Sequence, residues 1–165
     1  MTSVPRRLGI TQRQVGNLVH DAFMTFEDLP EDILNLPLTD PDLQADVIDL
    51  IMGMDVRHSG GVALMVCDEL DRGLQPIVLS DVPDSADTTG LRQLLDLLLP
   101  MVGEDKGAVL IGRGRRRGLV PTDRDREWHQ CAIDACRRHG VRLLGFHLAT
   151  PQGVEGLPEP LSRAS

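Results

Sequence analysis

The sequence predicts an α/β domain built around a mixed sheet, with strands and helices in the order ββαβαβ. Two observations predict this fold class. Short apolar runs bounded by glycines or polar turns recur at 62–67, 75–82 and 108–111, as strands require. Stretches with apolar residues every three or four positions separate the later runs, as crossover helices require. Crossover helices favour a sheet with parallel members and right-handed connections.

Two helices are expected before the first strand. Residues 11–26 and 42–54 each align their apolar side chains on one face, and an acidic, proline-bearing connector joins them. We therefore expect residues 1–58 to form a helical N-terminal extension. Its apolar faces are the expected contact for a homo-oligomer.

The α/β domain itself is expected over residues 59–150. The turn-rich segment 68–73 separates the first two strand runs, which predicts an antiparallel hairpin. The next helix is marked by a leucine stripe that ends near Gly103. Residues 151–165 are rich in proline and glycine, so we expect an irregular C-terminal tail. The leucine stripe comprises Leu91, Leu94, Leu95, Leu98 and Leu99.

Residues 107–140 form the most informative stretch. A buried strand is followed by an arginine-rich loop, Arg113–Gly118, and then by a helix. Thr122 stands where a helix N-cap belongs, and Gly140 supplies the stop. Residues 141–149 read as the last strand. The helix carries one apolar stripe, made of Trp128, Cys131, Ala132, Ala135 and Cys136.

The charge of the chain is uneven. The 165 residues have a net charge of −8, yet residues 1–105 hold 19 acids and 6 bases while residues 106–165 hold 6 acids and 11 bases. An acidic protein is a poor non-specific ligand for nucleic acid. The basic half can still hold an anion, or an acidic segment of its own chain or of a twin subunit.

The remaining composition predicts a cytoplasmic protein that is not bound to a membrane. No apolar run approaches the roughly 20 residues that span a bilayer, and the N-terminus lacks an apolar signal core. Three cysteines fit no disulfide framework, and we expect Cys131 and Cys136 to be buried and reduced. No cofactor is expected.

The candidate site is the arginine loop with the start of the next helix. Several guanidinium groups among glycines can clamp a phosphate or a carboxylate bidentately, and helix N–H groups add donors. The alternative is a solvated loop neutralised by nearby acids. Aromatic residues are scarce, which gives little support to base stacking and hence to nucleic acid as the ligand. The predicted anion-binding residues are Arg113, Arg115, Arg116, Arg117, Thr122 and Asp125.

The order of elements resembles the JAB/MPN superfamily, specifically its RadC-like branch, whose layers are like those of cytidine deaminases. Residues 121–125, Pro-Thr-Asp-Arg-Asp, resemble that branch's Pro-Ser-x-x-Asp motif, and residues 140–147 resemble its leucine-glycine strand. The resemblance covers roughly residues 60–155. It implies a RadC/JAB-like fold for this domain.

The chain departs from this family at the metal motif. The resemblance places a His-x-His pair where this sequence has Arg113, Gly114 and Arg115. Arginine stays protonated and cannot ligate zinc, so we expect neither a metal nor catalytic residues of that family's kind.

These observations favour a non-catalytic binding domain whose arginine loop holds an anionic ligand or partner. Two alternatives stay open. One is a metal-independent or atypical hydrolase that uses a remodelled pocket formed by the arginine loop, Thr122, Asp125 and His147. The other is an oligomerisation module.

Overall fold

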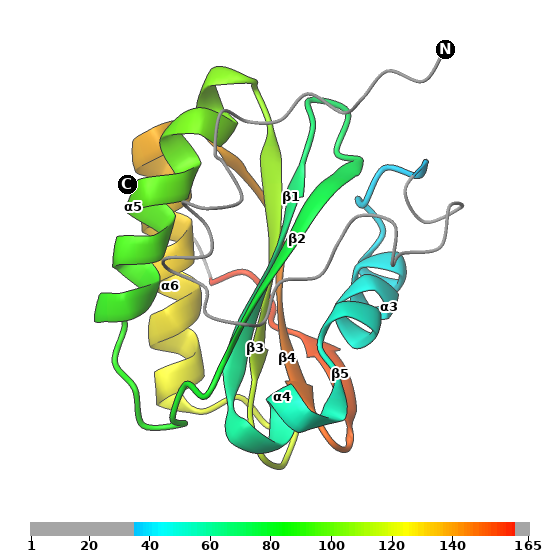
Figure 1. Cartoon of the computed structure of the whole chain (residues 1–165), viewed down its shortest axis with the longest axis vertical. Helices are drawn as coiled ribbons and strands as arrows, with labels where there is room; N and C mark the ends of the chain where they lie inside the picture. The colour runs from blue at the N-terminus through cyan, green and yellow to red at the C-terminus, as the bar shows by residue number, and fades with distance from the viewer. Residues whose placement is uncertain (1–34, 161–165) are drawn as a thin grey trace.

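Five strands form one mixed sheet in the computed structural model, which describes residues 35–160. Their spatial order is β2-β1-β3-β4-β5, and β3 and β4 are parallel while the other neighbours are antiparallel (Figure 1). The strands are β1 (Gly61–Cys67), β2 (Gly73–Ser80), β3 (Ala108–Gly114), β4 (Arg142–Thr150) and β5 (Gly153–Gly156).

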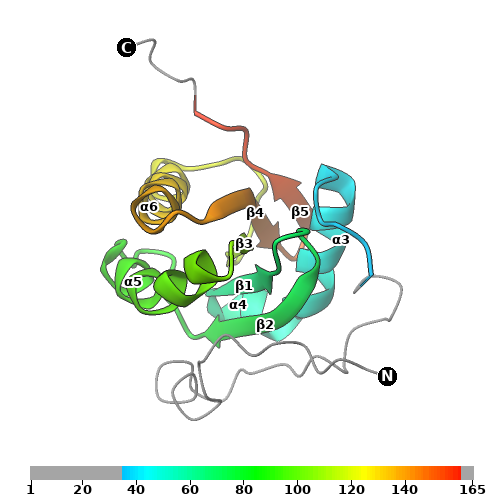
Figure 2. The same cartoon turned by 90° about the horizontal axis from the view of Figure 1, so that it is seen from above.

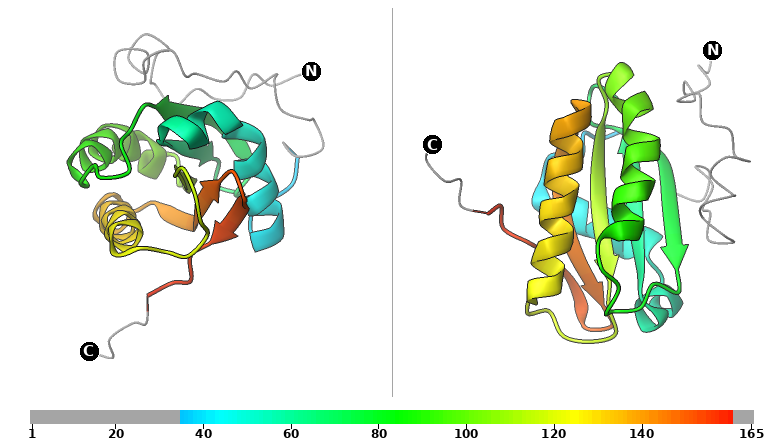
Figure 3. Two further views of the ribbon diagram at one scale, coloured as in Figure 1. Left: turned by 90° about the horizontal axis from the view of Figure 1, so that it is seen from below. Right: turned by 90° about the vertical axis from the view of Figure 1, so that its left-hand side faces the viewer.

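Helices cover both faces of the sheet. Seen from above, α5 and α6 lie on one side of the strands and α3 and α4 on the other (Figure 2). The side view in Figure 3 shows α5 and α6 running next to each other across the first face. The four helices of the described residues are α3 (Pro41–Ile51), α4 (Met54–Ser59), α5 (Thr89–Glu104) and α6 (Asp123–His139).

The alternation of side chains along the central strands explains this double cover. Every residue of β1 and β3 is buried, because both strands consist almost entirely of apolar residues and glycine. Along β1, Val62 and Leu64 point into the core under α5 and α6, whereas Ala63 and Met65 point into the core under α3. A strand that is apolar on both faces needs a layer of helices on each.

The α/β class and the mixed sheet are confirmed, and so is the hairpin of β1 and β2. The structure adds one element to the predicted ββαβαβ order. Strand β5 lies in the segment expected to be an irregular tail, and it pairs with β4 from His147 to Thr150. The two chain segments are joined by a turn at Pro151 and Gln152, short enough to form a hairpin.

The N-terminal part also differs from the expectation. The helix predicted at 42–54 ends at Ile51, and a second short helix, α4, begins after Gly53. Both helices pack on the sheet and complete one of its two cores, so they belong to the domain rather than to an extension. The helix predicted at 11–26, and any oligomer contact made by it, lies outside the described residues.

The caps predicted for α6 are confirmed. Thr122 accepts a hydrogen bond from the Asp125 amide, the Asp125 side chain accepts one from the Thr122 amide, and the pair forms a capping box. Gly140 ends the helix with a φ of 65°, a left-handed conformation that glycine adopts readily. The helix therefore starts and stops where the sequence indicates.

No helix between residues 35 and 160 has the length and apolar content needed to cross a bilayer.

Candidate functional site

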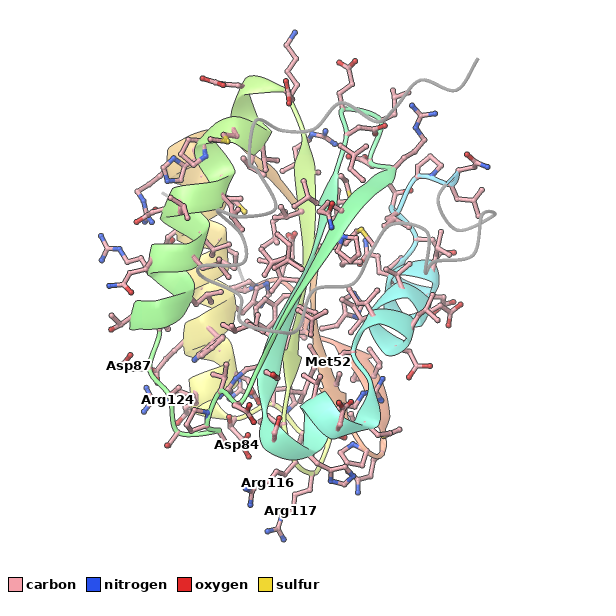
Figure 4. The ribbon with its side chains drawn as sticks, in the orientation of Figure 1. Met52, Asp84, Asp87, Arg116, Arg117 and Arg124 are labelled. Carbon is pink, nitrogen blue, oxygen red and sulfur yellow. The ribbon has the colours of Figure 1, made fainter. Side chains whose placement is uncertain are left out.

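The strand register brings two loops to one edge of the sheet. Gly61 at the start of β1 pairs with Ser80 at the end of β2 and with Gly114 at the end of β3. The loop that follows β2, residues 81–88, and the loop that follows β3, residues 115–122, therefore leave the sheet at the same edge. The N-termini of α5 and α6 lie at this edge as well (Figure 4).

A buried ion pair lies just inside this edge. Arg113 is the penultimate residue of β3. Its guanidinium forms a hydrogen-bonded ion pair with the Asp125 carboxylate, and the two side chains are 2% and 0% exposed. Its second amino group donates to the Asp84 carbonyl oxygen over 2.7 Å. The guanidinium carbon lies 4.7 Å from the centre of the Trp128 ring, within the range of a cation–π contact.

Arg113 is not available to bind an anion at the surface. Burial lowers the pKa of its guanidinium, an effect that the Asp125 carboxylate opposes. Its amino groups are turned toward Asp125, the Asp84 carbonyl and Trp128. This arginine therefore joins β3, α6 and the loop after β2, and an external anion has no access to it.

The second arginine shapes the loop from within. The Arg115 Nε atom lies 3.1 Å from the same Asp125 oxygen that Arg113 contacts. Its two amino groups donate to the carbonyl oxygens of Arg117, at 2.8 Å, and of Val120, at 3.0 Å. Arg115 thus spans the loop and holds the backbone between residues 117 and 120 in one conformation.

The remaining two arginines are presented to solvent. Arg116 and Arg117 are exposed, they form no ion pair within residues 35–160, and their side chains project away from the sheet (Figure 4). Gly118 follows with a φ of 80°, and its amide donates to the Gln152 side chain in the turn before β5. The loop is therefore tied at both ends, and it presents two free cations at its tip.

The carboxylate of Asp125 is fully engaged. One oxygen contacts Arg113 and Arg115, and the other accepts the Thr122 amide over 2.8 Å. The Thr122 hydroxyl accepts the Asp125 amide over 3.2 Å. Of the six residues predicted to bind an anion, these four build the loop, and only Arg116 and Arg117 are free to meet a ligand.

The same geometry tests the zinc site that the family resemblance implies. Positions 113, 115 and 125, where that family has two histidines and an aspartate, do converge, because both arginines contact the Asp125 carboxylate. Zinc needs lone pairs on nitrogen, sulfur or oxygen, and a protonated guanidinium has none to give. The donor set does not fit the metal. No group of three histidine, cysteine or acidic side chains suited to a metal occurs within residues 35–160.

An apolar pocket opens beside the ion pair. It has a volume of about 300 Å³ and lies between β1, β2, the start of α5 and the Trp128 ring of α6. Asp87 is its one charged lining residue. Apolar residues from the strands and the loop form the walls, among them Val62, Leu79, Val82 and Ala86. The Trp128 indole N–H donates to the Ala86 carbonyl, which fixes the ring against the pocket.

His147 lies on the other face of the sheet. Its Nε2 atom is 2.9 Å from the Gln44 side-chain oxygen of α3, and burial lowers the pKa of its imidazole to about 4. Arg113, Thr122 and Asp125 belong to the side that carries α6. The remodelled pocket of the hydrolase alternative needs His147 beside those residues, and the structure does not bring it there.

The sequence analysis missed two features of this edge. The apolar pocket forms because α6 approaches the loop after β2. No local sequence pattern predicts that approach. The three aspartates of that loop, Asp81, Asp84 and Asp87, recur at every third position, and this even spacing of acids is the sequence signal for the rim of the pocket.

The chain was compared with protein-family models, with curated proteins and with solved structures, and none of the three comparisons found a match.

Proposed function

We propose that this chain is a non-catalytic binding domain on a RadC/JAB-like scaffold, and that the tip of its arginine loop holds an anionic group of a ligand or partner. The proposal rests on one observation: the four arginines of the loop fall into a pair that contacts Asp125 and an exposed pair. Two are consumed in building the loop around Asp125, and Arg116 and Arg117 are exposed without a counter-charge in the described residues.

The arrangement of elements supports the scaffold part of the proposal. A hairpin, a crossover helix, a strand, a loop, a capped helix and a parallel strand follow one another, and positions 113, 115 and 125 meet at the end of β3. The arginines at that point replace a metal by fixed positive charge. Since a guanidinium offers no lone pair to a substrate or a water molecule, binding is favoured over hydrolysis.

The chemistry of the tip favours a carboxylate-bearing partner over nucleic acid. A guanidinium binds carboxylate or phosphate through two parallel hydrogen bonds, and a fixed loop reduces the entropy lost on binding. Base stacking needs exposed aromatic rings, but the sole tryptophan of the chain is buried. The net charge of −8 further weakens attraction to a polyanion.

A titration with labelled peptides tests the proposal. We expect a glutamate-rich peptide to bind at low salt, and a glutamine-rich peptide of the same length to bind far less. The variant Arg116→Ala/Arg117→Ala should lose affinity by about tenfold, since each exposed guanidinium–carboxylate pair contributes up to about 1 kcal/mol and the variant removes two.

The matched control is Arg126→Ala/Arg137→Ala. It removes the same net charge from exposed positions of α6 and should bind as the wild type does. Equal losses in both variants, or no binding by the wild type, would contradict the proposal. A DNA duplex titrated in parallel that bound more tightly than the peptide would reassign the ligand to nucleic acid.

A further inference from the structure

The apolar pocket has exposed acids along its rim. Asp87 lines the pocket, and Asp84 and Asp81 precede it in the same exposed loop. A hydrogen bond from the Thr89 amide lowers the pKa of the Asp87 carboxyl, so this group is ionised at neutral pH. Within residues 35–160 no ion pair is formed by these three carboxylates. A nearby cation, Arg124, pairs with Glu127, and its charge also lowers the pKa of Asp87 (Figure 4).

The arginine tip carries the complementary features. Val120 stands beside Arg116 and Arg117 in the loop, and its side chain is 79% exposed, the most exposed large apolar side chain among the described residues. A solvent-exposed valine in a loop that is fixed by hydrogen bonds does not contribute to the core. It forms an exposed apolar projection in the loop that also carries the two cations.

Projection and pocket lie on the same edge but do not meet within one chain. The two loops leave the sheet on either side of β1, and they are tied together through the hydrogen bond from Arg113 to the Asp84 carbonyl. The labelled side chains of Asp84, Asp87, Arg116 and Arg117 lie at one end of the molecule in Figure 4, with the two arginines pointing outward. The exposed acids and the two arginines of the tip therefore share one surface, and within residues 35–160 they form no ion pair with each other.

We infer that a second copy of this chain is the partner, with Val120 of one copy seated in the apolar pocket of the other and Arg116 and Arg117 facing its Asp84 and Asp87. The inference rests on the proposed function, because the same two arginines bind the anionic groups. Tip and pocket share one edge, so a two-fold axis lets both copies make the contact at once and closes the dimer.

The contact is expected to be weak and sensitive to salt. Exposed ion pairs contribute little each, and their main effect is on orientation and on the rate of encounter. Burial of the valine adds an apolar term that salt does not remove. We therefore expect a dimer that forms at low ionic strength. It should dissociate as added salt screens the charges.

Sedimentation velocity of the full chain tests the inference. At an ionic strength of about 0.01 M, where the Debye length is about 30 Å, we expect a concentration-dependent dimer. At about 1 M, where it is about 3 Å, the dissociation constant should rise by about tenfold or more. A monomer at every concentration under low salt would overturn the inference.

Charge reversal identifies the surface. The variant Arg116→Glu/Arg117→Glu gives an acidic tip that faces an acidic rim, and Asp84→Lys/Asp87→Lys gives a basic rim that faces a basic tip. Each variant alone should be monomeric. An equimolar mixture should restore the dimer, since both of its contacts then pair opposite charges.

Restoration in the mixture also shows that both variants fold. Val120→Ser should weaken the wild-type dimer without changing its salt dependence. The inference would be overturned if a dimer survived either charge reversal. It would also be overturned if the mixture stayed monomeric while both variants retained the near-ultraviolet circular dichroism signal of Trp128.

The two proposals fail differently. A wild-type chain that stays monomeric but binds the glutamate-rich peptide through Arg116 and Arg117 keeps the proposed function and removes the second copy as its partner. Failure of both measurements removes both proposals.

Discussion

Arg113 and Asp125 show how one pair of residues decides what a loop can do. Both side chains are buried, and each compensates the charge of the other. A buried charge is tolerated only when it is paired and hydrogen-bonded, because its desolvation is strongly unfavourable. The pair therefore stabilises the edge of the sheet as a unit. Loss of Asp125 leaves Arg113 uncompensated, whereas loss of Arg113 leaves Asp125 with Arg115.

We expect Asp125→Asn to lower the free energy of unfolding by about 3–5 kcal/mol, because it leaves the Arg113 guanidinium buried without a counter-charge. Arg113→Met is the comparison, since Asp125 then keeps Arg115 as its counter-charge and the variant should lose less stability. Urea unfolding followed by the fluorescence of Trp128 measures both variants. A loss below about 1 kcal/mol for Asp125→Asn would show that the pair is not desolvated as the structure describes.

At the scale of elements, buried polar side chains hold α3 and α4 against the sheet. The Arg57 guanidinium of α4 donates to the Met52 and Thr150 carbonyl oxygens and pairs with Asp49, and it is almost fully buried. It satisfies carbonyl groups at the end of α3 that the helix itself leaves free. The C-terminus of α3 is thereby joined to the end of β4.

The second such contact joins Gln44 to His147. The Gln44 amide nitrogen donates to the carbonyl oxygens of Leu38 and Leu144, so its oxygen must face the imidazole and accept the Nε2 proton. The His147 Nδ1 atom then carries a lone pair, and it has no partner in the described residues. A proton on that atom would place a charge between α3 and the sheet without compensation.

We therefore expect His147 to make stability depend on pH. Its pKa is about 4 in the folded chain and about 6.5 when unfolded. The unfolded state binds more protons between these values, so stability is fully present above pH 6.5 and falls as the pH drops toward 4, by up to about 3 kcal/mol.

His147→Gln is the control, because its amide can donate to Gln44 and does not titrate in this range. The difference in unfolding free energy between wild type and variant should shrink or reverse between pH 7 and pH 4.5. A difference that is constant with pH would show that His147 is not buried in its neutral form.

For the whole molecule, the three positions that meet at the end of β3 come from the strand, from the loop after it and from α6. Their convergence is a property of the fold, since β3 and α6 must pack for residues 113 and 115 to reach Asp125. The scaffold is thus compatible with a different set of side chains at the same point. This compatibility can be tested by substitution.

We expect Arg113→His/Arg115→His to bind one zinc ion, because two imidazoles and the Asp125 carboxylate then supply three ligands with one position left open. Isothermal titration calorimetry measures the uptake. The wild type and Arg113→His alone serve as controls and should bind far more weakly. A folded double variant that takes up no zinc would argue against aligning residues 113 and 115 with the His-x-His pair of the resemblance.

Local patterns in the sequence were enough to locate most elements of this protein. Apolar runs and the leucine stripe located the strands of the hairpin and α5, and Thr122 and Gly140 located the ends of α6. These predictions succeed because strand alternation, helix periodicity and capping act between residues a few positions apart. The short strand β5 was missed because four residues carry too little pattern to distinguish a strand from a loop.

Which charges are buried follows from the packing of distant segments and not from local sequence. Arg113 and Arg116 look alike in the sequence, yet one is internal and the other is free, because Asp125 approaches from α6 on one side of β3. Likewise, nothing local distinguishes His147 until Gln44, 103 residues away, packs against it. The environment of a charged group is set by long-range packing, and that packing determines whether an arginine supports the fold or remains available to a partner.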